Sequence, residues 1–264
     1  MTLRITILGC GSSGGVPRIG AMWGQCDPEN PKNRRRRCSI LVEQRTKSGT
    51  TTVLVDTSPD LREQLLSVRC EHVDGVLFTH DHADHTHGID DLRMVAYAMK
   101  GRIDCHFDAA TRASIEQRFD YCFRSKPGSS YPPILAAKTM QPGVALEING
   151  AGGPLGVLPI RQVHGDIASL GFRFGNIAYS PDVSDIADAD AALLDGLDLW
   201  IVDALRHTPH PSHFSLKQAL GWIERMKAKR AVLTHMTGDL DYDALRRELP
   251  AHVEPAWDGM VIEV

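Results

Sequence analysis

A short polar segment rich in histidine follows directly on an apolar run, Gly75 to Phe78, and residues 78–85 read FTHDHADH. Such a run is typical of a buried strand, and open α/β sheets place their sites in loops at the carboxyl ends of strands. Imidazole is the commonest metal ligand near neutral pH, and a carboxylate among imidazoles suits Zn, Mn or Fe better than Ca or Mg. We therefore predict a metal-binding loop. The alternate residues His80 and His82 can reach one ion, whereas the adjacent Asp84 and His85 diverge towards a second.

Three further candidate ligands stand where later apolar runs end. They are His164 after Val157 to Val163, Asp182 after Ile177 to Ser180, and His235 after Ala231 to Thr234. A single buried histidine is more often a hydrogen-bonded core residue than a metal ligand. Several strands that each deliver a His or an Asp to one rim make a shared site, so we predict that these three residues join the loop of residues 80–85.

Short β-rich runs alternate with helical patterns along the chain. The expected strands are Leu3 to Leu8, Ser39 to Val42, Thr52 to Asp56, Gly75 to Thr79, Val157 to Val163, Asn176 to Ser180, Leu199 to Asp203, Ala231 to Thr234 and Met260 to Val264. The expected helices are Asp60 to Ser67, Ile89 to Met99, Thr111 to Phe119, Ser215 to Lys227 and Tyr242 to Leu249. The mixture predicts an α/β fold. Because no repeat and no Pro-, Gly- or Ser-rich linker divides the chain, we expect one domain over residues 1–264, with surface loops at 126–133 and 150–154.

The order of these histidines and aspartates resembles the metallo-β-lactamase superfamily, and the resemblance extends over essentially the whole chain. It implies an αββα four-layer sandwich with the site at one edge of two facing sheets. Within the superfamily the chain resembles the PhnP-type phosphodiesterases, which are cyclic-phosphate hydrolases related to ribonuclease Z. The motifs that carry this closer resemblance are GCGSSGGVP at residues 9–17, WGQC at 23–26, RRRCS at 35–39, Val55 with Asp56, SHFSL at 212–216 and WDGM at 257–260.

The resemblance also implies a role for each candidate residue. The first metal would be bound by His80, His82 and His164, the second by Asp84, His85 and His235, and Asp182 would bridge both. Zn and Mn are the expected metals, and a hydroxide shared by two such cations is nucleophilic because they lower the pKa of bound water towards about 7. Asp84 and His213 are the expected catalytic residues. His213 would act on the substrate, as a proton donor to the leaving group or as a partner of the phosphoryl oxygens, and Asp56 would hold the metal loop through backbone hydrogen bonds.

Two motifs suggest other functions. Residues 9–14 satisfy the G-x-G-x-x-G pattern of dinucleotide-binding loops, but VPRIG follows where a helix should begin, so we expect this loop to pass under the rim of the site instead. The run Arg34 to Arg37 could contact a substrate's outer phosphate or ribose. We expect a solvated face, which is the usual role of a charge run. His207 and His210, among prolines, are expected in a solvated loop as well.

The cysteines are scattered without a CxxC pair. PhnP-type proteins hold a structural zinc through closely spaced cysteines and a late histidine. Of that set the chain keeps only Cys26, and Gly238 stands where the late ligand is expected, so we predict no structural zinc. The six cysteines read as reduced thiols, and no targeting signal or membrane span is visible, which predicts a cytoplasmic protein.

The net charge of -4 gives no electrostatic footprint for extended nucleic acid or for a membrane. We therefore expect an enzyme, a metal-dependent phosphodiesterase whose partner is a small cyclic phosphate or nucleotide; the sequence leaves homodimerisation open. The alternatives are a tRNA-processing nuclease of the ribonuclease Z type, which usually needs a long gripping arm and a basic surface, and a lactonase or thioesterase of the same fold. A non-catalytic accessory protein of cofactor synthesis is the fourth hypothesis.

Overall fold

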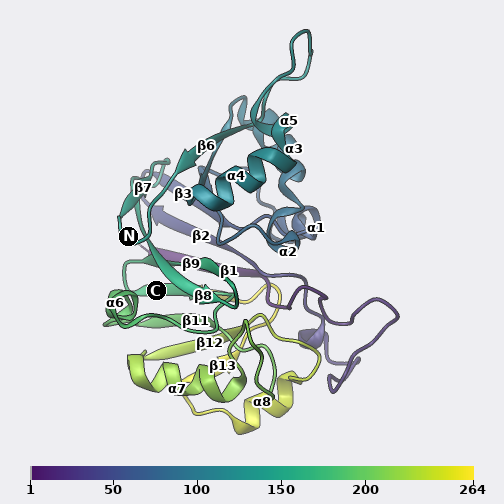
Figure 1. Cartoon of the computed structure of the whole chain (residues 1–264), viewed down its shortest axis with the longest axis vertical. Helices are drawn as coiled ribbons and strands as arrows, with labels where there is room; N and C mark the ends of the chain where they lie inside the picture. Colours follow the sequence, from purple (N-terminus) through teal and green to yellow (C-terminus); the bar gives the residue numbers. More distant parts are fainter. Residues whose placement is uncertain (1) are drawn as a thin grey trace.

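The computed structural model describes residues 2–264 and is built around two seven-stranded sheets (Figure 1). Along the first sheet the order is β14 (Val261–Glu263), β1 (Thr2–Gly9), β2 (Ser39–Thr46), β3 (Gly49–Val55), β4 (Gly75–Leu77), β5 (Ile103–Phe107) and β6 (Leu135–Thr139). Along the second it is β13 (Val253–Pro255), β12 (Arg230–Thr234), β11 (Leu199–Asp203), β10 (Ile177–Ser180), β9 (Ile167–Phe174), β8 (Leu155–His164) and β7 (Leu146–Ile148).

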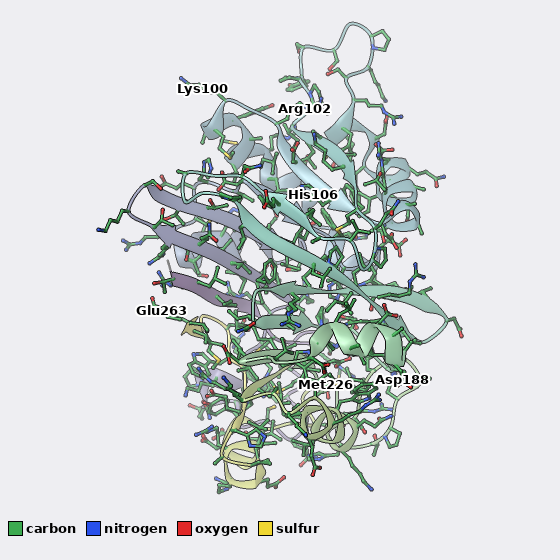
Figure 2. The ribbon with its side chains drawn as sticks, turned by 90° about the vertical axis from the view of Figure 1, so that its left-hand side faces the viewer. Lys100, Arg102, His106, Asp188, Met226 and Glu263 are labelled. Carbon is green, nitrogen blue, oxygen red and sulfur yellow. The ribbon has the colours of Figure 1, made fainter. Side chains whose placement is uncertain are left out.

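Helices cover the outer face of each sheet. With the first sheet lie α1 (Leu61–Val68), α2 (Ala83–Thr86), η2 (Ile89–Asp91), α3 (Leu92–Met99), α4 (Ala109–Arg118) and α5 (Asp120–Phe123); with the second lie α6 (Asp188–Ala191), η3 (Ala192–Leu194), α7 (Leu216–Met226) and α8 (Tyr242–Glu248). A short helical turn, η1 (Pro31–Asn33), lies in the loop after β1. In the turned view, Lys100 beyond α3 and Met226 at the end of α7 lie on opposite sides of the sheets (Figure 2).

Alternation along the strands separates two apolar layers. In β2, Ile40 and Val42 belong to the core between the two sheets, whereas Leu41 belongs to the core under the helices of the first sheet. Successive side chains of a strand point to opposite faces, so one strand can serve both layers. Because the inner core also takes Phe172 and Tyr179 from the second sheet, the architecture is the αββα sandwich that the sequence predicts.

All nine expected strands and all five expected helices are present, with small shifts at their ends. The strands that the sequence patterns did not reveal are β5, β6, β7, β9 and β13. Two of these have only three residues, β6 is rich in alanine, and β9 contains Gly171, so each gives a weak strand signal. The segments at 126–133 and 150–154 lie outside helices and strands, as expected.

Strand direction explains why one rim collects the polar residues. Strands β3 to β6 are parallel to one another, as are β10 to β13, and β8 runs parallel to β10 because each is antiparallel to β9. The carboxyl ends of β3, β4, β8, β10, β11 and β12 therefore meet at the same edge of the sandwich. A backbone hydrogen bond from Leu170 N–H to Thr79 O, and a bridge between Gly11 and Met236, join the two sheets there. Among residues 2–264, no helix combines the length and the apolar character needed to cross a membrane.

Candidate metal centre

Asp56 fixes the loop that follows β4. It comes directly after β3, with a φ of 63° that non-glycine residues rarely adopt, and it is fully buried. Its carboxylate accepts hydrogen bonds from the Thr79 N–H, the Thr79 hydroxyl and His85 Nδ1, each at 2.8 Å. The expected backbone hydrogen bond is confirmed. The bond to Nδ1 also orients the His85 ring and directs its Nε2 away from Asp56, the arrangement that second-shell carboxylates give to metal-binding histidines.

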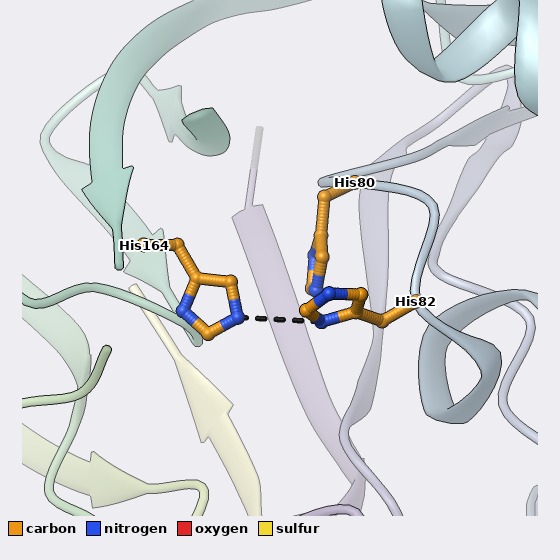
Figure 3. A group of neighbouring side chains, drawn as sticks. All are labelled: His80, His82 and His164. Atoms are coloured by element: carbon orange, nitrogen blue, oxygen red, sulfur yellow. Dashed lines mark hydrogen bonds between the residues drawn. The ribbon is translucent and has the colours of Figure 1, made fainter. Parts of the chain in front are cut away.

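His80, His82 and His164 form the first of two donor groups (Figure 3). Two of their ring nitrogens, Nε2 of His164 and Nδ1 of His82, lie 3.3 Å apart. His164 ends β8, and its Nδ1 lies 2.7 Å from the Ser212 carbonyl oxygen, which can only accept, so its Nδ1 carries the proton and Nε2 offers a lone pair to the group.

The second donor group joins Asp84, His85 and His235. Asp84 Oδ2 lies 3.5 Å from His85 Nε2 and 3.8 Å from His235 Nε2. His235 follows β12 with a φ of 57°, a strained conformation for a residue with a side chain. The strained backbone here and at Asp56 flanks the same cluster, which is where proteins commonly retain such strain.

Asp182 lies between the two groups. Its Oδ2 is 3.0 Å from His85 Nε2, and its Oδ1 is 3.3 Å from His235 Nε2 and 3.7 Å from His164 Nε2. Its Oδ1 thus lies near a member of each group, and its Oδ2 lies near His85 of the second group. The structure therefore brings all seven predicted ligands together. Their division between two ions stays a prediction, because overlapping groups also join Asp182 to His80 and His85, and to His164 and His213.

Buried atoms without hydrogen-bond partners test whether these residues fit metal ions. Within residues 2–264, four such atoms are Nε2 of His80, His85 and His235, and Oδ2 of Asp182; the 3.0 Å contact between Asp182 Oδ2 and His85 Nε2 lacks hydrogen-bond geometry. A buried polar atom left without a partner costs about 1–3 kcal/mol, so native proteins rarely leave several side by side. Divalent cations would satisfy all four at once, and a set of imidazole and carboxylate donors suits Zn, Mn or Fe. The residues fit a metal centre.

Burial and mutual proximity shift the pKa values of the cluster. At His85 burial lowers the pKa, but the carboxylates of Asp182, Asp84 and Asp56 outweigh it and raise that pKa well above its usual value. Burial, reinforced by His85, holds the pKa of His80 well below its usual value, and burial lowers the pKa of His164 to about 4. Burial alone would raise the pKa of Asp182, but the surrounding histidines, His235 first, outweigh it and keep that pKa well below its usual range. Near pH 7 the two rings are neutral and the carboxylate is ionised, which are the forms that bind cations.

His213 lies against this cluster, and its closest partner is a residue that the sequence analysis missed. Asp203, at the end of β11, is fully buried, and its Oδ2 lies 2.8 Å from His213 Nδ1. The His213 ring stacks on the His235 ring with centroids 4.6 Å apart. His213 is also close enough to Asp182 and His164 to serve as a ligand itself. Asp203 is the last residue of an apolar run, and Asp182 closely follows another such run. This position at the end of a run is the sequence signal that could have identified Asp203.

A cavity of about 440 Å³ opens beside His213 and His235. One wall comes from the glycine loop after β1, so this loop lies at the rim of the site as expected. No helix follows directly after residue 17, so the loop is not a dinucleotide-binding loop. His210 lines the same cavity and is half-buried, with its ring 5.2 Å from that of His213. The expectation of a solvated loop is wrong for His210 and right for His207, which is exposed.

The arginine run is only in part the solvated face that the sequence predicts: Arg34 is exposed and Arg36 and Arg37 are half-buried, but Arg35 is not solvated. Arg35 is buried, and its guanidinium donates to the carbonyl oxygens of Thr237 at 2.9 Å and Leu240 at 2.6 Å. In an extended backbone every second side chain points inward. Four identical residues in a row conceal this alternation in the sequence. The others are paired or stacked: Arg36 with Asp258, Arg37 with Asp60, and Arg34 over the Trp23 ring.

The surroundings of Cys26 bear on the predicted loss of a structural zinc. Arg35 Nη1 lies 3.9 Å from Cys26 Sγ, so a cationic side chain already stands beside this thiol. Gly238 packs so closely that a Cβ atom there would lie 2.5 Å from the Trp23 carbonyl oxygen. A side chain at position 238 would not fit, and the absence of a zinc at this place stays a prediction.

Residues 51–236 match the model of the β-lactamase superfamily domain. The chain belongs to the metallo-β-lactamase superfamily. Members of this superfamily are hydrolases, and the histidine and aspartate groups fit the divalent metals that its fold binds. A curated octanoyltransferase from Porphyromonas gingivalis is 32% identical over 262 residues, which are 98% of this chain and 51% of that protein. The chain thus spans about half the length of that relative.

Solved structures of the superfamily resemble the whole chain. A diphosphatase of the PhnP family is 34% identical, with a TM-score of 0.87 over 100% of this chain and 98% of that one. Zn(2+)-bound PqqB from Methylobacterium extorquens is 16% identical with a TM-score of 0.75, over 99% of this chain and 100% of that one. The short form of human tRNase Z is 20% identical with a TM-score of 0.66, over 98% of each chain. The last two share the superfamily fold.

Two metal ions per chain are expected in the purified protein, because seven donors in two groups leave neither ion short of ligands. The number of metal ions per chain is measured by metal analysis of protein that is purified without chelators and dialysed against metal-free buffer. A third, tightly held zinc would contradict the loss of the cysteine site, and one ion per chain would contradict the two-group interpretation.

Asp182→Ala should remove a ligand from both groups at once. We expect it to lower both metal content and turnover more completely than His164→Ala or His235→Ala, each of which affects one group. The comparison requires metal analysis and rate measurements on all three variants at equal protein concentration. Activity retained in Asp182→Ala would be incompatible with a bridging role.

Proposed function

We propose that the chain is a metal-dependent phosphodiesterase acting on small cyclic phosphates or nucleotides. The observation that carries this proposal is the Asp203–His213 pair next to the two donor groups, at the mouth of a cavity. A histidine positioned beside the metal ligands can protonate the leaving group of a phosphodiester. Asp84 and His213 remain the proposed catalytic residues, with His80, His82, Asp84, His85, His164, Asp182 and His235 as metal ligands.

The two cations, when bound, would supply Lewis acidity for the phosphoryl oxygens and a water that is nucleophilic near pH 7. The chain's own residues do the rest. Burial lowers the pKa of His213, which favours the neutral ring, so the ring has to take up a second proton before it can act as a proton donor. Asp203 holds Nδ1, and the other ring nitrogen is then free to donate to, or accept from, the substrate.

The 34% identity to a PhnP-family diphosphatase supports phosphorus chemistry over the alternatives. A turnover assay with bis(p-nitrophenyl) phosphate and added Mn²⁺ or Zn²⁺ tests the proposal. We expect metal-dependent release of p-nitrophenolate that Asp182→Ala abolishes. A preparation with two ions per chain that releases none would contradict the proposal and favour an accessory protein.

Hydrolysis of an acyl thioester or a lactone is a second candidate. It rests on the relative named octanoyltransferase, although that name describes a protein about twice as long as this chain. Octanoyl thioesters and an acyl lactone, tested beside bis(p-nitrophenyl) phosphate, separate the two chemistries. Cleavage of a precursor tRNA at its 3′ end would instead favour the ribonuclease Z alternative.

A single domain, a cytoplasmic location, Zn or Mn as the native metal and a homodimer stay proposals.

His213→Ala should separate chemistry from metal binding. We expect the variant to keep its two metals but to lose roughly two to four powers of ten in turnover of a 2′,3′-cyclic nucleotide, the usual scale for a lost general acid. The loss should be smaller for bis(p-nitrophenyl) phosphate, because p-nitrophenolate leaves without protonation. Equal losses on both substrates would favour a role in holding the phosphoryl oxygens, and loss of a metal ion would make His213 a ligand.

A further inference from the structure

His210 is the outermost of a row of neighbouring imidazole rings. The centroid of the His213 ring lies 4.6 Å from that of His235, at the metal centre, and 5.2 Å from that of His210. His210 lines the cavity and is half-buried. Within residues 2–264 it belongs to none of the candidate donor groups, so its ring is available to a ligand in the cavity.

The hydrogen bonds of His210 establish which of its ring nitrogens carries the proton. Its Nδ1 lies 3.3 Å from the Ser212 backbone nitrogen and 3.1 Å from the Ser212 Oγ. A backbone N–H can only donate, so Nδ1 accepts and the proton of the ring lies on Nε2. Burial lowers the pKa of His210, and the nearby His213 lowers it further, which favours the same neutral ring.

The Nε2–H group of His210 is an unused donor. It has no hydrogen-bond partner in the part of the chain from residue 2 onwards. It is not among the buried unpartnered atoms of that part either, so solvent or a ligand can reach it. His213 has to take up a second proton before it can donate one, whereas neutral His210 already donates from Nε2.

Ser212 connects His210 to the metal centre. Its carbonyl oxygen lies 2.7 Å from Nδ1 of the predicted ligand His164 (Figure 3), while its N–H and hydroxyl hold the His210 ring. The turn between β8 and β9 packs against Ser212, because a Cβ atom on Gly165 would lie 2.9 Å from the Ser212 Cβ. One residue therefore positions both a metal ligand and the cavity histidine.

The loop that carries His210 is held in place before a ligand binds. Arg206 Nε donates to the Thr208 carbonyl oxygen at 3.2 Å, and Arg206 Nη2 donates to the Pro209 carbonyl oxygen at 2.9 Å. Pro209 and Pro211 stand on either side of His210, and their rings restrict the backbone. A donor on such a loop loses little conformational entropy when it binds a substrate.

The place and the neutral charge of this donor favour an uncharged oxygen of the substrate. In the proposed function the phosphoryl group lies at the metal centre and beside His213, so the organic part of the substrate lies further out, near His210. A neutral imidazole N–H donates readily to a hydroxyl oxygen. The cavity of about 440 Å³ has room for this organic part.

We propose that His210 is a specificity-determining residue, which donates a hydrogen bond from Nε2 to a hydroxyl oxygen in the organic part of the substrate. The inference rests on the proposed phosphodiesterase function and adds a residue that selects among its substrates. His213 acts at the bond that is broken, whereas His210 recognises the group attached to the phosphate. Ser212 is the positioning residue for His210.

Two cyclic phosphates that differ by one hydroxyl group test the inference: glycerol 1,2-cyclic phosphate and propane-1,2-diol cyclic phosphate. The wild type should have the higher kcat/KM for the glycerol compound. His210→Ala should lower this kcat/KM by roughly 3- to 12-fold, the scale of a lost hydrogen bond between uncharged groups. It should leave the propanediol compound and bis(p-nitrophenyl) phosphate unaffected. His210→Gln should recover part of the loss, because its amide N–H also donates.

His207→Ala is the matched control, because His207 is an exposed histidine of the same loop, and it should leave every rate unchanged. Ser212→Ala removes one of the two groups that hold His210 Nδ1 and should give a smaller loss of the same selectivity. All these variants should keep the metal content of the wild type.

Three results would overturn the role of His210 and leave the phosphodiesterase proposal standing, provided that the wild type hydrolyses bis(p-nitrophenyl) phosphate. They are a wild type that does not distinguish the two cyclic phosphates, a His210→Ala variant with equal losses or no loss on both, and a His210→Ala variant that loses metal. If the metal-loaded wild type hydrolyses none of the phosphates, both proposals fail.

Discussion

The carboxylate of Asp182 lies within 3.7 Å of ring nitrogens from His85, His164 and His235, which come from three separate segments of the chain. These rings and this carboxylate are buried, and several of their atoms have no hydrogen-bond partner within residues 2–264. Burying so many polar atoms without partners costs free energy of folding unless cations bind to them. The centre therefore links metal binding to the stability of the rim. A metal ion that binds the folded chain but not the unfolded chain stabilises the fold.

Strand direction makes this cluster achievable. Parallel strands of both sheets end at one edge, so a residue in the last position of a strand, or directly after it, lies near the residues that end the other strands. That is why Asp56, His164, Asp203 and His235 meet although they are far apart in the sequence. The backbone strain at Asp56 and His235 is compensated by the contacts their side chains make, including the hydrogen bonds that Asp56 accepts from Thr79 and His85.

The sequence predicted the parts of the molecule that follow a period or a repeated rule. Apolar runs predicted nine of the strands and pointed to His164, Asp182 and His235 at or near their ends, because burial leaves a regular pattern. The histidine-rich composition of residues 80–85 gave the other four candidate ligands. Asp203 obeys the same rule, but no motif distinguishes it from other residues at the ends of strands. The burial of Arg35 could not be inferred, since its partners are carbonyl oxygens of Thr237 and Leu240, about two hundred residues away. The cavity likewise depends on how the loops pack, which no local pattern encodes.

Anomalous diffraction from crystals of the metal-loaded protein, recorded at the absorption edge of the bound metal, tests the central claim most directly. Two peaks are predicted, one among His80, His82 and His164 and the other among Asp84, His85 and His235, with Asp182 in contact with both. A single peak, or a peak with His213 or Cys26 as a ligand in place of one of these groups, would contradict the account.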